Sequence, residues 1–188
     1  MIDADKLIAD FVRAAEIAGL NIKQGNINIE NLPAPHIPPS TLPAGKMAVY
    51  VFQWGDQCLK VGKVGPKSQA RYTSQHYNPK SSNSNLAKSI LKDKAVVGIT
   101  AIDEHTVGNW IRQNTDRVNF LVPESFGIPL LSLLEAFLQC RLKPRFEGFD
   151  TQKWAPNKVL PTESPGNPAL ADLCCRLNRA LEKCSLDV

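Results

Sequence analysis

A tyrosine and a lysine on two adjacent candidate strands are the first residues whose types and spacing could do chemistry. Side chains alternate between the two faces of a strand, so Tyr50 lies on one face of the strand expected over 47–52. Lys60 likewise lies on one face of a second strand expected over 58–62. If the intervening loop has three residues (54–56), Tyr50 lies opposite Lys60. An ammonium beside a phenol favours the phenolate and lowers the tyrosine pKa. The alternative is that the pair is surface decoration with no chemical role.

Glu135 is the second candidate, because it lies inside an apolar stripe of a helix expected over 130–142. The stripe consists of Leu131, Leu134, Leu138 and Leu142. Glutamates are almost never buried without a partner. Two roles are therefore open: a carboxylate that binds a hard cation such as Mg²⁺, or a residue at the edge of the stripe that reaches water or pairs with Arg141 or Arg145.

The elements that must position these residues follow from periodicity and from proline content. Strand patterns cover 47–52, 58–62, 95–102 and 118–122, and helical patterns cover 3–18, 67–76, 86–92, 106–114 and 130–142. Prolines crowd 31–45 and 156–168, and a last amphipathic helix follows the second of these stretches. This order of elements predicts a small α+β domain with an arm on either side.

The charge distribution favours a polyanionic partner. The net charge is only +4, but between Asp56 and Asp93 the chain has no acidic residue and carries Lys60, Lys63, Lys67, Arg71, Lys80, Lys88 and Lys92. A segment of one sign attracts polyanions, nucleic acid first among them. A solvated loop that happens to be basic would have the same composition.

Composition and cysteine spacing exclude several classes of protein. Apolar and charged fractions are those of a globular chain, and the apolar runs are shorter than the ~20 residues that span a bilayer. The N terminus lacks the basic and apolar regions of a signal peptide. The five cysteines form no CxxC pair, which argues against a disulfide framework and a structural zinc site. We therefore expect a cytoplasmic protein with no membrane partner.

The order of several short motifs resembles the GIY-YIG nuclease superfamily. The run Ala48-Val49-Tyr50 matches the first motif with its tyrosine kept, and Lys60-Val61-Gly62 matches the second with its glycine kept. Arg71 falls where the superfamily has an arginine, and Glu135 falls where it has a glutamate. The segment 118–146 resembles the last strand, the glutamate helix and the terminal Lys-Pro element. Each motif is short, whereas their order and spacing together are specific.

The chain departs from the superfamily pattern at two positions. Lys60 replaces the second tyrosine, a change similar to one in a restriction-endonuclease branch. The asparagine after the Pro element is replaced, with Glu147 nearest its place. Members often also have a His or Tyr one turn beyond the arginine, a position for which Gln75, His76 and Tyr77 compete.

The resemblance implies a fold and a domain division. The fold is α+β, with a three-stranded antiparallel sheet flanked by helices and with N- and C-terminal helical arms. Residues 1–45 would form an N-terminal helix and Pro-rich arm, 46–149 the GIY-YIG-like nuclease domain, and 150–188 a Pro-rich segment and C-terminal helix.

The resemblance also implies a divalent-metal-dependent endonuclease that hydrolyses phosphodiester bonds in nucleic acid, with DNA expected, in restriction, defence or repair. Tyr50 would be the general base and Lys60 would lower its pKa or orient the water. Arg71 would bind the phosphate through its planar guanidinium, and Glu135 would hold Mg²⁺ or Mn²⁺. The substrate-binding residues would be Lys63, Lys67 and His76. The expected partner is nucleic acid, and the chain could also form a homodimer. The alternative function left open is a non-catalytic nucleic-acid-binding module on a degenerate GIY-YIG domain.

Overall fold

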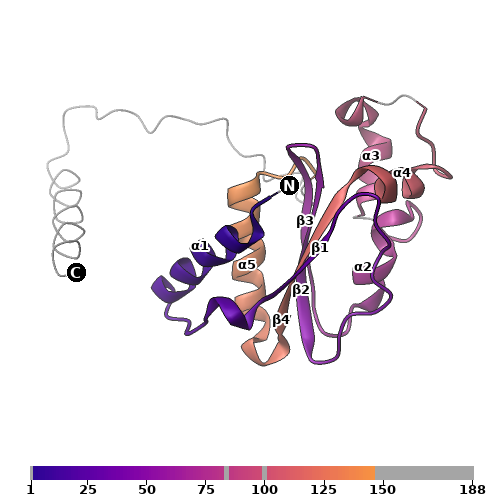
Figure 1. The fold of residues 1–188 in the computed structure, drawn as a ribbon. Coiled ribbons are helices and arrows are strands. Elements are labelled where there is room, and N and C mark those ends of the chain that lie inside the picture. Colours follow the sequence, from indigo (N-terminus) through magenta and orange to yellow (C-terminus); the bar gives the residue numbers. More distant parts are fainter. Residues whose placement is uncertain (1, 83–84, 99–100, 147–188) are drawn as a thin grey trace, which may run out of the picture. The chain divides into compact units, whose positions relative to one another are not determined.

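The computed structural model describes residues 2–82, 85–98 and 101–146 (Figure 1). The chain divides into two compact units, Met1–Asp150 and Thr151–Val188. Glu147, the second proline-rich stretch, the expected C-terminal helix and Cys174, Cys175 and Cys184 lie outside the described residues.

A four-stranded antiparallel sheet forms the centre of the first unit. The strand order is β1 (Asn28–Leu32), β4 (Asp116–Pro123), β2 (Lys46–Trp54) and β3 (Gln57–Val64). The α+β class is confirmed, but the expected count of three strands is wrong. The additional strand is β1, whose sequence is polar and poor in β-branched residues. Pairing with β4 over its whole length, rather than intrinsic propensity, makes this edge segment a strand.

Helices cover both faces of the sheet (Figure 1). On one side lie α1 (Ala4–Ile17) and α5 (Gly127–Leu142). On the other side lie α2 (Gln69–Thr73), α3 (Leu86–Lys92) and α4 (Val107–Asn114). Short 3-10 turns join these elements at Gln24–Asn26, Gln75–Tyr77, Lys94–Val97 and Glu124–Phe126.

The alternating side chains of β2 separate two cores. Met47, Val49 and Val51 join the first core with α1 and α5, whereas Ala48, Tyr50 and Phe52 join the second core under α2 to α4. We call these two sides of the sheet the α1/α5 face and the α2–α4 face. The alternation predicted for residues 47–52 is therefore confirmed.

The N-terminal segment contributes to the first core. Asp3 caps α1 by accepting a hydrogen bond from the Lys6 amide at 3.0 Å, and Ile8 and Phe11 are fully buried. The sequence analysis assigned residues 1–45 to an N-terminal arm. Because β1 also pairs with β4, much of this segment packs into the same compact unit as the sheet.

The strand expected over 95–102 is a different structure. Lys94–Val97 forms a 3-10 turn, and Gly98 ends it with φ of +63°. A left-handed glycine reverses the chain direction, so the described residues before it, Lys94–Val97, do not extend into a strand.

One described segment, Glu124–Leu142, is long and apolar enough by length and composition to cross a membrane. Four of its leucines (Leu130, Leu131, Leu134, Leu138) are buried in the core on the α1/α5 face. Core helices of soluble proteins pass the same test, so this finding is weak evidence for a membrane span.

Candidate functional site

Tyr50 lies near the middle of β2 on the α2–α4 face, with only 2% of its surface exposed. Its neighbours across the sheet are Gly62 on β3 and Asn119 on β4. A Cβ at position 62 would collide with the Tyr50 hydroxyl. The ring therefore lies across Gly62, toward the edge strand, and a glycine at this position is needed to accommodate it.

The β2–β3 hairpin differs from the expected one in its turn and its register. The loop has two residues, Gly55 and Asp56, rather than three. A two-residue loop with regular pairing would put Lys60 on the face opposite Tyr50. A β-bulge between Gln53 and Phe52 shifts the register, so that Lys60 pairs with Phe52.

The bulge returns Lys60 to the face that carries Tyr50. The predicted direct pairing of Tyr50 with Lys60 is therefore wrong, because Tyr50 pairs with Gly62, but the predicted common face is correct. The lysine is 5% exposed, and its ammonium donates to the Phe146 carbonyl at 3.3 Å.

His76 packs directly on Tyr50, with ring centroids 4.6 Å apart, and is 1% exposed. Burial lowers the pKa of His76 well below its ordinary value, and the positive charges of Lys60, Arg117 and Arg71 lower it further. The ring is therefore neutral. The Leu86 amide donates to Nδ1 at 3.3 Å, so the proton is on Nε2.

The Nε2–H of His76 is a buried donor with no hydrogen-bond partner in the described part of the chain. Arg71 lies in α2 with its side chain exposed, close enough for its charge to affect His76. This side of the sheet thus gathers a phenol, an ammonium, a guanidinium and an imidazole donor.

Arg117 is a residue that sequence reasoning missed. It is fully buried on β4 and donates to the Asn119 side chain at 2.8 Å, the Tyr72 carbonyl at 2.7 Å and the Tyr77 hydroxyl at 3.3 Å. Its guanidinium also lies 5.8 Å from the Tyr50 ring centroid. An arginine and an asparagine two apart in an otherwise apolar strand pattern were the available signal.

Glu30, on the unexpected strand β1, completes this buried polar network. Its carboxylate accepts from the Tyr72 hydroxyl at 2.6 Å and from the Asn119 amide at 3.2 Å. Burial and the bond to Glu30 raise the pKa of Tyr72 above its ordinary value. The Arg117 charge is thereby connected to a carboxylate through the Asn119 side chain.

Glu135 lies on the other side of the sheet, with α5. It forms an ion pair with Lys63 at 2.8 Å, and Lys63 also donates to Ser132 at 3.0 Å. Lys63 pairs across the sheet with Val49, which belongs to the core on the α1/α5 face. The two arginines considered as partners for Glu135 bind other acids, Arg141 with Asp10 and Arg145 with Asp93.

The structure therefore divides the predicted site residues into two groups. Tyr50, Lys60 and His76 lie on the α2–α4 face with Arg71 nearby, whereas Glu135 and Lys63 lie on the α1/α5 face. Lys67 is exposed in the loop between β3 and α2. Among the described residues, no group of three or more His, Cys, Asp or Glu side chains is arranged to hold a metal ion.

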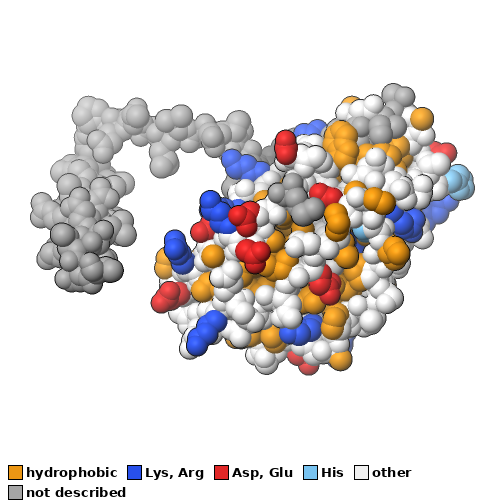
Figure 2. Space-filling model, in the orientation of Figure 1, with side chains coloured by type: hydrophobic (Ala, Val, Ile, Leu, Met, Phe, Trp, Pro, Cys, Tyr) orange, Lys and Arg blue, Asp and Glu red, His pale blue; other side chains and the backbone are white. Residues whose placement is uncertain are grey.

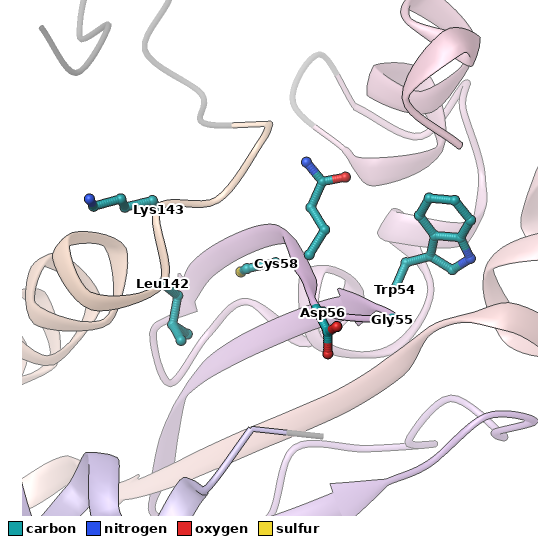
Figure 3. A pocket seen from close by; sticks show the side chains of 7 residues that line it. Trp54, Gly55, Asp56, Cys58, Leu142 and Lys143 are labelled. Atoms are coloured by element: carbon teal, nitrogen blue, oxygen red, sulfur yellow. The ribbon is translucent and has the colours of Figure 1, made fainter. Parts of the chain in front are cut away.

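A pocket of about 580 Å³ lies elsewhere, between the hairpin turn and the end of α5 (Figure 3). Trp54 and Lys143 are on opposite sides of it, and Cys58 and Leu142 lie between them. None of the predicted catalytic residues lines it.

No protein-family model matches the chain, and no curated protein or solved structure matches it either.

Proposed function

We propose that the protein is an endonuclease that hydrolyses phosphodiester bonds in nucleic acid, with DNA as substrate and Mg²⁺ or Mn²⁺ as cofactor. The observation that carries the proposal is the bulged hairpin, which puts Lys60 on the face of Tyr50, next to a neutral His76. A tyrosine that can accept a proton from water as its phenolate, two cations and an imidazole N–H without a partner among the described residues are groups that can activate water and bind a phosphate.

Each residue of the α2–α4 face has a role in the proposal. Tyr50, as its phenolate, accepts a proton from the attacking water and becomes the neutral phenol, and the positive charge of Lys60 favours the phenolate before that transfer. The exposed guanidinium of Arg71 binds two phosphate oxygens through its planar fork, a geometry that a lysine ammonium cannot reproduce. The Nε2–H of His76 donates to a phosphate oxygen, which would give this buried donor the partner it lacks.

Glu135 fits a divalent cation in type and environment. Mg²⁺ keeps several waters and needs only one or two carboxylates from the protein. The Glu135 side chain is 19% exposed and already holds a positive group at 2.8 Å. Glu135 would hold the cation on the α1/α5 face beside the edge strand β3, and the cation would supply positive charge for the leaving oxygen of a phosphodiester bound across that edge.

A second candidate function is a nucleic-acid-binding module without catalysis. Two observations favour it: Tyr50 is almost completely buried, and Glu135 is paired with a lysine on the other side of the sheet. Both functions use the basic segment, in which Lys63 and Lys80 are neutralised by Glu135 and Glu104. In the view of Figure 2 basic and acidic side chains are interspersed, so this side of the molecule has no continuous basic stripe.

Incubation of the purified protein with plasmid DNA and with RNA tests the proposal. We expect cleavage of DNA with Mg²⁺ or Mn²⁺ and none with EDTA. Tyr50→Phe and Glu135→Gln should lower the rate by at least 10²-fold while duplex binding persists, because both remove groups used in the chemical step. Arg71→Ala should lose turnover and some affinity, since it contacts phosphate before the reaction as well.

Glu16→Gln and Arg13→Ala are matched controls, because both side chains are exposed on α1. They should retain wild-type cleavage. Wild-type activity of Glu135→Gln, free of contaminating nuclease, would contradict the assignment of the cation site. Binding of duplex DNA without cleavage under all metal conditions would favour the binding module.

A further inference from the structure

We infer that Lys63 and a divalent cation compete for the Glu135 carboxylate, and that Lys63, once displaced, binds the substrate phosphate. The inference rests on the proposed function and adds a regulatory step to it. Cation binding and nucleic-acid binding are then coupled through one lysine.

The contacts of Lys63 carry the first step. Its ammonium lies 2.8 Å from Glu135 Oε2 and 3.0 Å from Ser132 Oγ. The lysine therefore occupies space from which a cation would bind the carboxylate. An ammonium and a divalent cation repel each other at such distances, so binding of the cation requires Lys63 to move away.

The position of Lys63 on β3 carries the second step. This strand is an edge of the sheet, and Lys63 directly follows Gly62, over which the Tyr50 hydroxyl lies. The segment after α5 hydrogen-bonds only the first half of β3 in the described structure, through Cys58 and Leu59. Lys63 and Tyr50 point to opposite faces of the sheet, but β3 is an edge strand, so the long, flexible lysine side chain can pass around this edge toward a phosphate bound beside Tyr50.

The Lys63 side chain is 35% exposed, so the movement requires no opening of the core. When a cation displaces Lys63 from Glu135, the lysine charge becomes available to a phosphodiester. Conversely, a phosphodiester that binds Lys63 leaves the Glu135 carboxylate available to the cation. By linkage each ligand raises the affinity of the other by the same factor. The pair therefore couples substrate binding to cation binding.

Mn²⁺ binding to the full chain, measured by electron paramagnetic resonance in the absence of DNA, tests the competition. Lys63→Met keeps the aliphatic stem and removes the charge. We expect it to bind Mn²⁺ about fivefold more tightly than wild type, which corresponds to ~1 kcal/mol. Lys67→Met removes an exposed lysine four residues away and controls for net charge, so its affinity should change by less than about twofold.

Three outcomes are informative. Equal Mn²⁺ affinity of wild type and Lys63→Met, with binding lost in Glu135→Gln, would overturn the competition and leave the proposed function standing. Unchanged Mn²⁺ binding by Glu135→Gln would overturn both, because the cation would then be held elsewhere. Tighter binding in Lys63→Met and loss in Glu135→Gln supports the inference.

Binding of a duplex oligonucleotide in EDTA tests the release of Lys63. Glu135→Gln frees the Lys63 ammonium and should therefore raise the affinity for the duplex. This gain should be about threefold larger in the wild-type background than in the Lys63→Met background. The comparison removes the general effect of deleting a negative charge, because both backgrounds share it. Equal gains in the two backgrounds would show that Lys63 does not reach the phosphate and would overturn the second step.

Discussion

The two faces of the sheet are held together in different ways. On the α1/α5 face, α1 and α5 pack apolar side chains such as Phe11, Leu131 and Leu134, all fully buried, and the ion pair of Lys63 and Glu135 stays partly exposed. On the α2–α4 face the helices are short, and the buried residues include Arg117, Asn119, Lys60 and His76. The α1/α5 face therefore depends on the packing of apolar side chains, whereas the α2–α4 face combines an apolar core with several buried polar groups.

The difference shows why the candidate chemistry concentrates on the α2–α4 face. Buried cations beside a phenol and an imidazole are unfavourable unless hydrogen bonds compensate them. Arg117 donates hydrogen bonds to three acceptors and connects through Asn119 to Glu30.

The largest expected effect is from Arg117→Met. The substitution keeps much of the side-chain volume but leaves the Tyr72 carbonyl and the Asn119 side chain without their donor. We expect a loss of ~3 kcal/mol in the free energy of unfolding, measured with urea. Leu134→Met, on the α1/α5 face, conserves volume in an apolar site and should cost less than ~1.5 kcal/mol. Equal losses would contradict the distinction between the faces.

The next effect concerns the contact between β2 and β3. A methyl group at Gly62 collides with the Tyr50 side chain, so Gly62→Ala should destabilise the protein by roughly 1–3 kcal/mol in urea unfolding. The same substitution in a Tyr50→Ala background should cost much less, because the ring is gone. Gly25→Ala is the matched control, since nothing lies within 4 Å of its Cβ. A large loss at Gly25 would show that glycine replacement, not the Tyr50 contact, is responsible.

A third effect is the acid sensitivity of the α2–α4 face. His76 is neutral in the folded protein because its pKa lies well below 6.5, whereas the unfolded chain binds a proton near pH 6.5. The unfolded state then holds more protons below that pH, so stability falls on acidification, by up to ~1.4 kcal/mol per pH unit for this residue. Urea unfolding at pH 7, 6 and 5 should show this slope, and His76→Gln should reduce it. His105→Gln, which removes an exposed imidazole, should leave the slope unchanged.

The smallest effect is expected from the ion pair of the α1/α5 face. A double-mutant cycle of Lys63→Met and Glu135→Gln should give a coupling free energy of at most ~1 kcal/mol, because both side chains are partly solvated. The pair Lys80–Glu104 is more exposed, at 72% and 56%, and its coupling should be smaller still. A coupling of several kcal/mol at Glu135 would mean that the carboxylate is held for stability rather than for a ligand.

Local patterns were sufficient for most elements. The helices at Ala4–Ile17, Leu86–Lys92 and Val107–Asn114 lie within one or two residues of the expected ranges, because capping residues and apolar periodicity act over a few neighbouring positions. The alternation of β2 likewise follows from strand geometry alone, so the face of Tyr50 was predictable.

Register, partners and the fourth strand were decided by tertiary structure. Whether Lys60 shares the face of Tyr50 depends on one extra residue at a bulge, and the hairpin loop by itself would have given the opposite result. The partner of Glu135 is a lysine 72 positions earlier rather than a neighbouring arginine, because β3 and α5 pack together. Sequence alone thus named candidate residues such as Tyr50, Lys60 and Glu135, but not Arg117. Which of them meet is set by long-range packing, since each side chain binds whatever the completed fold brings within reach.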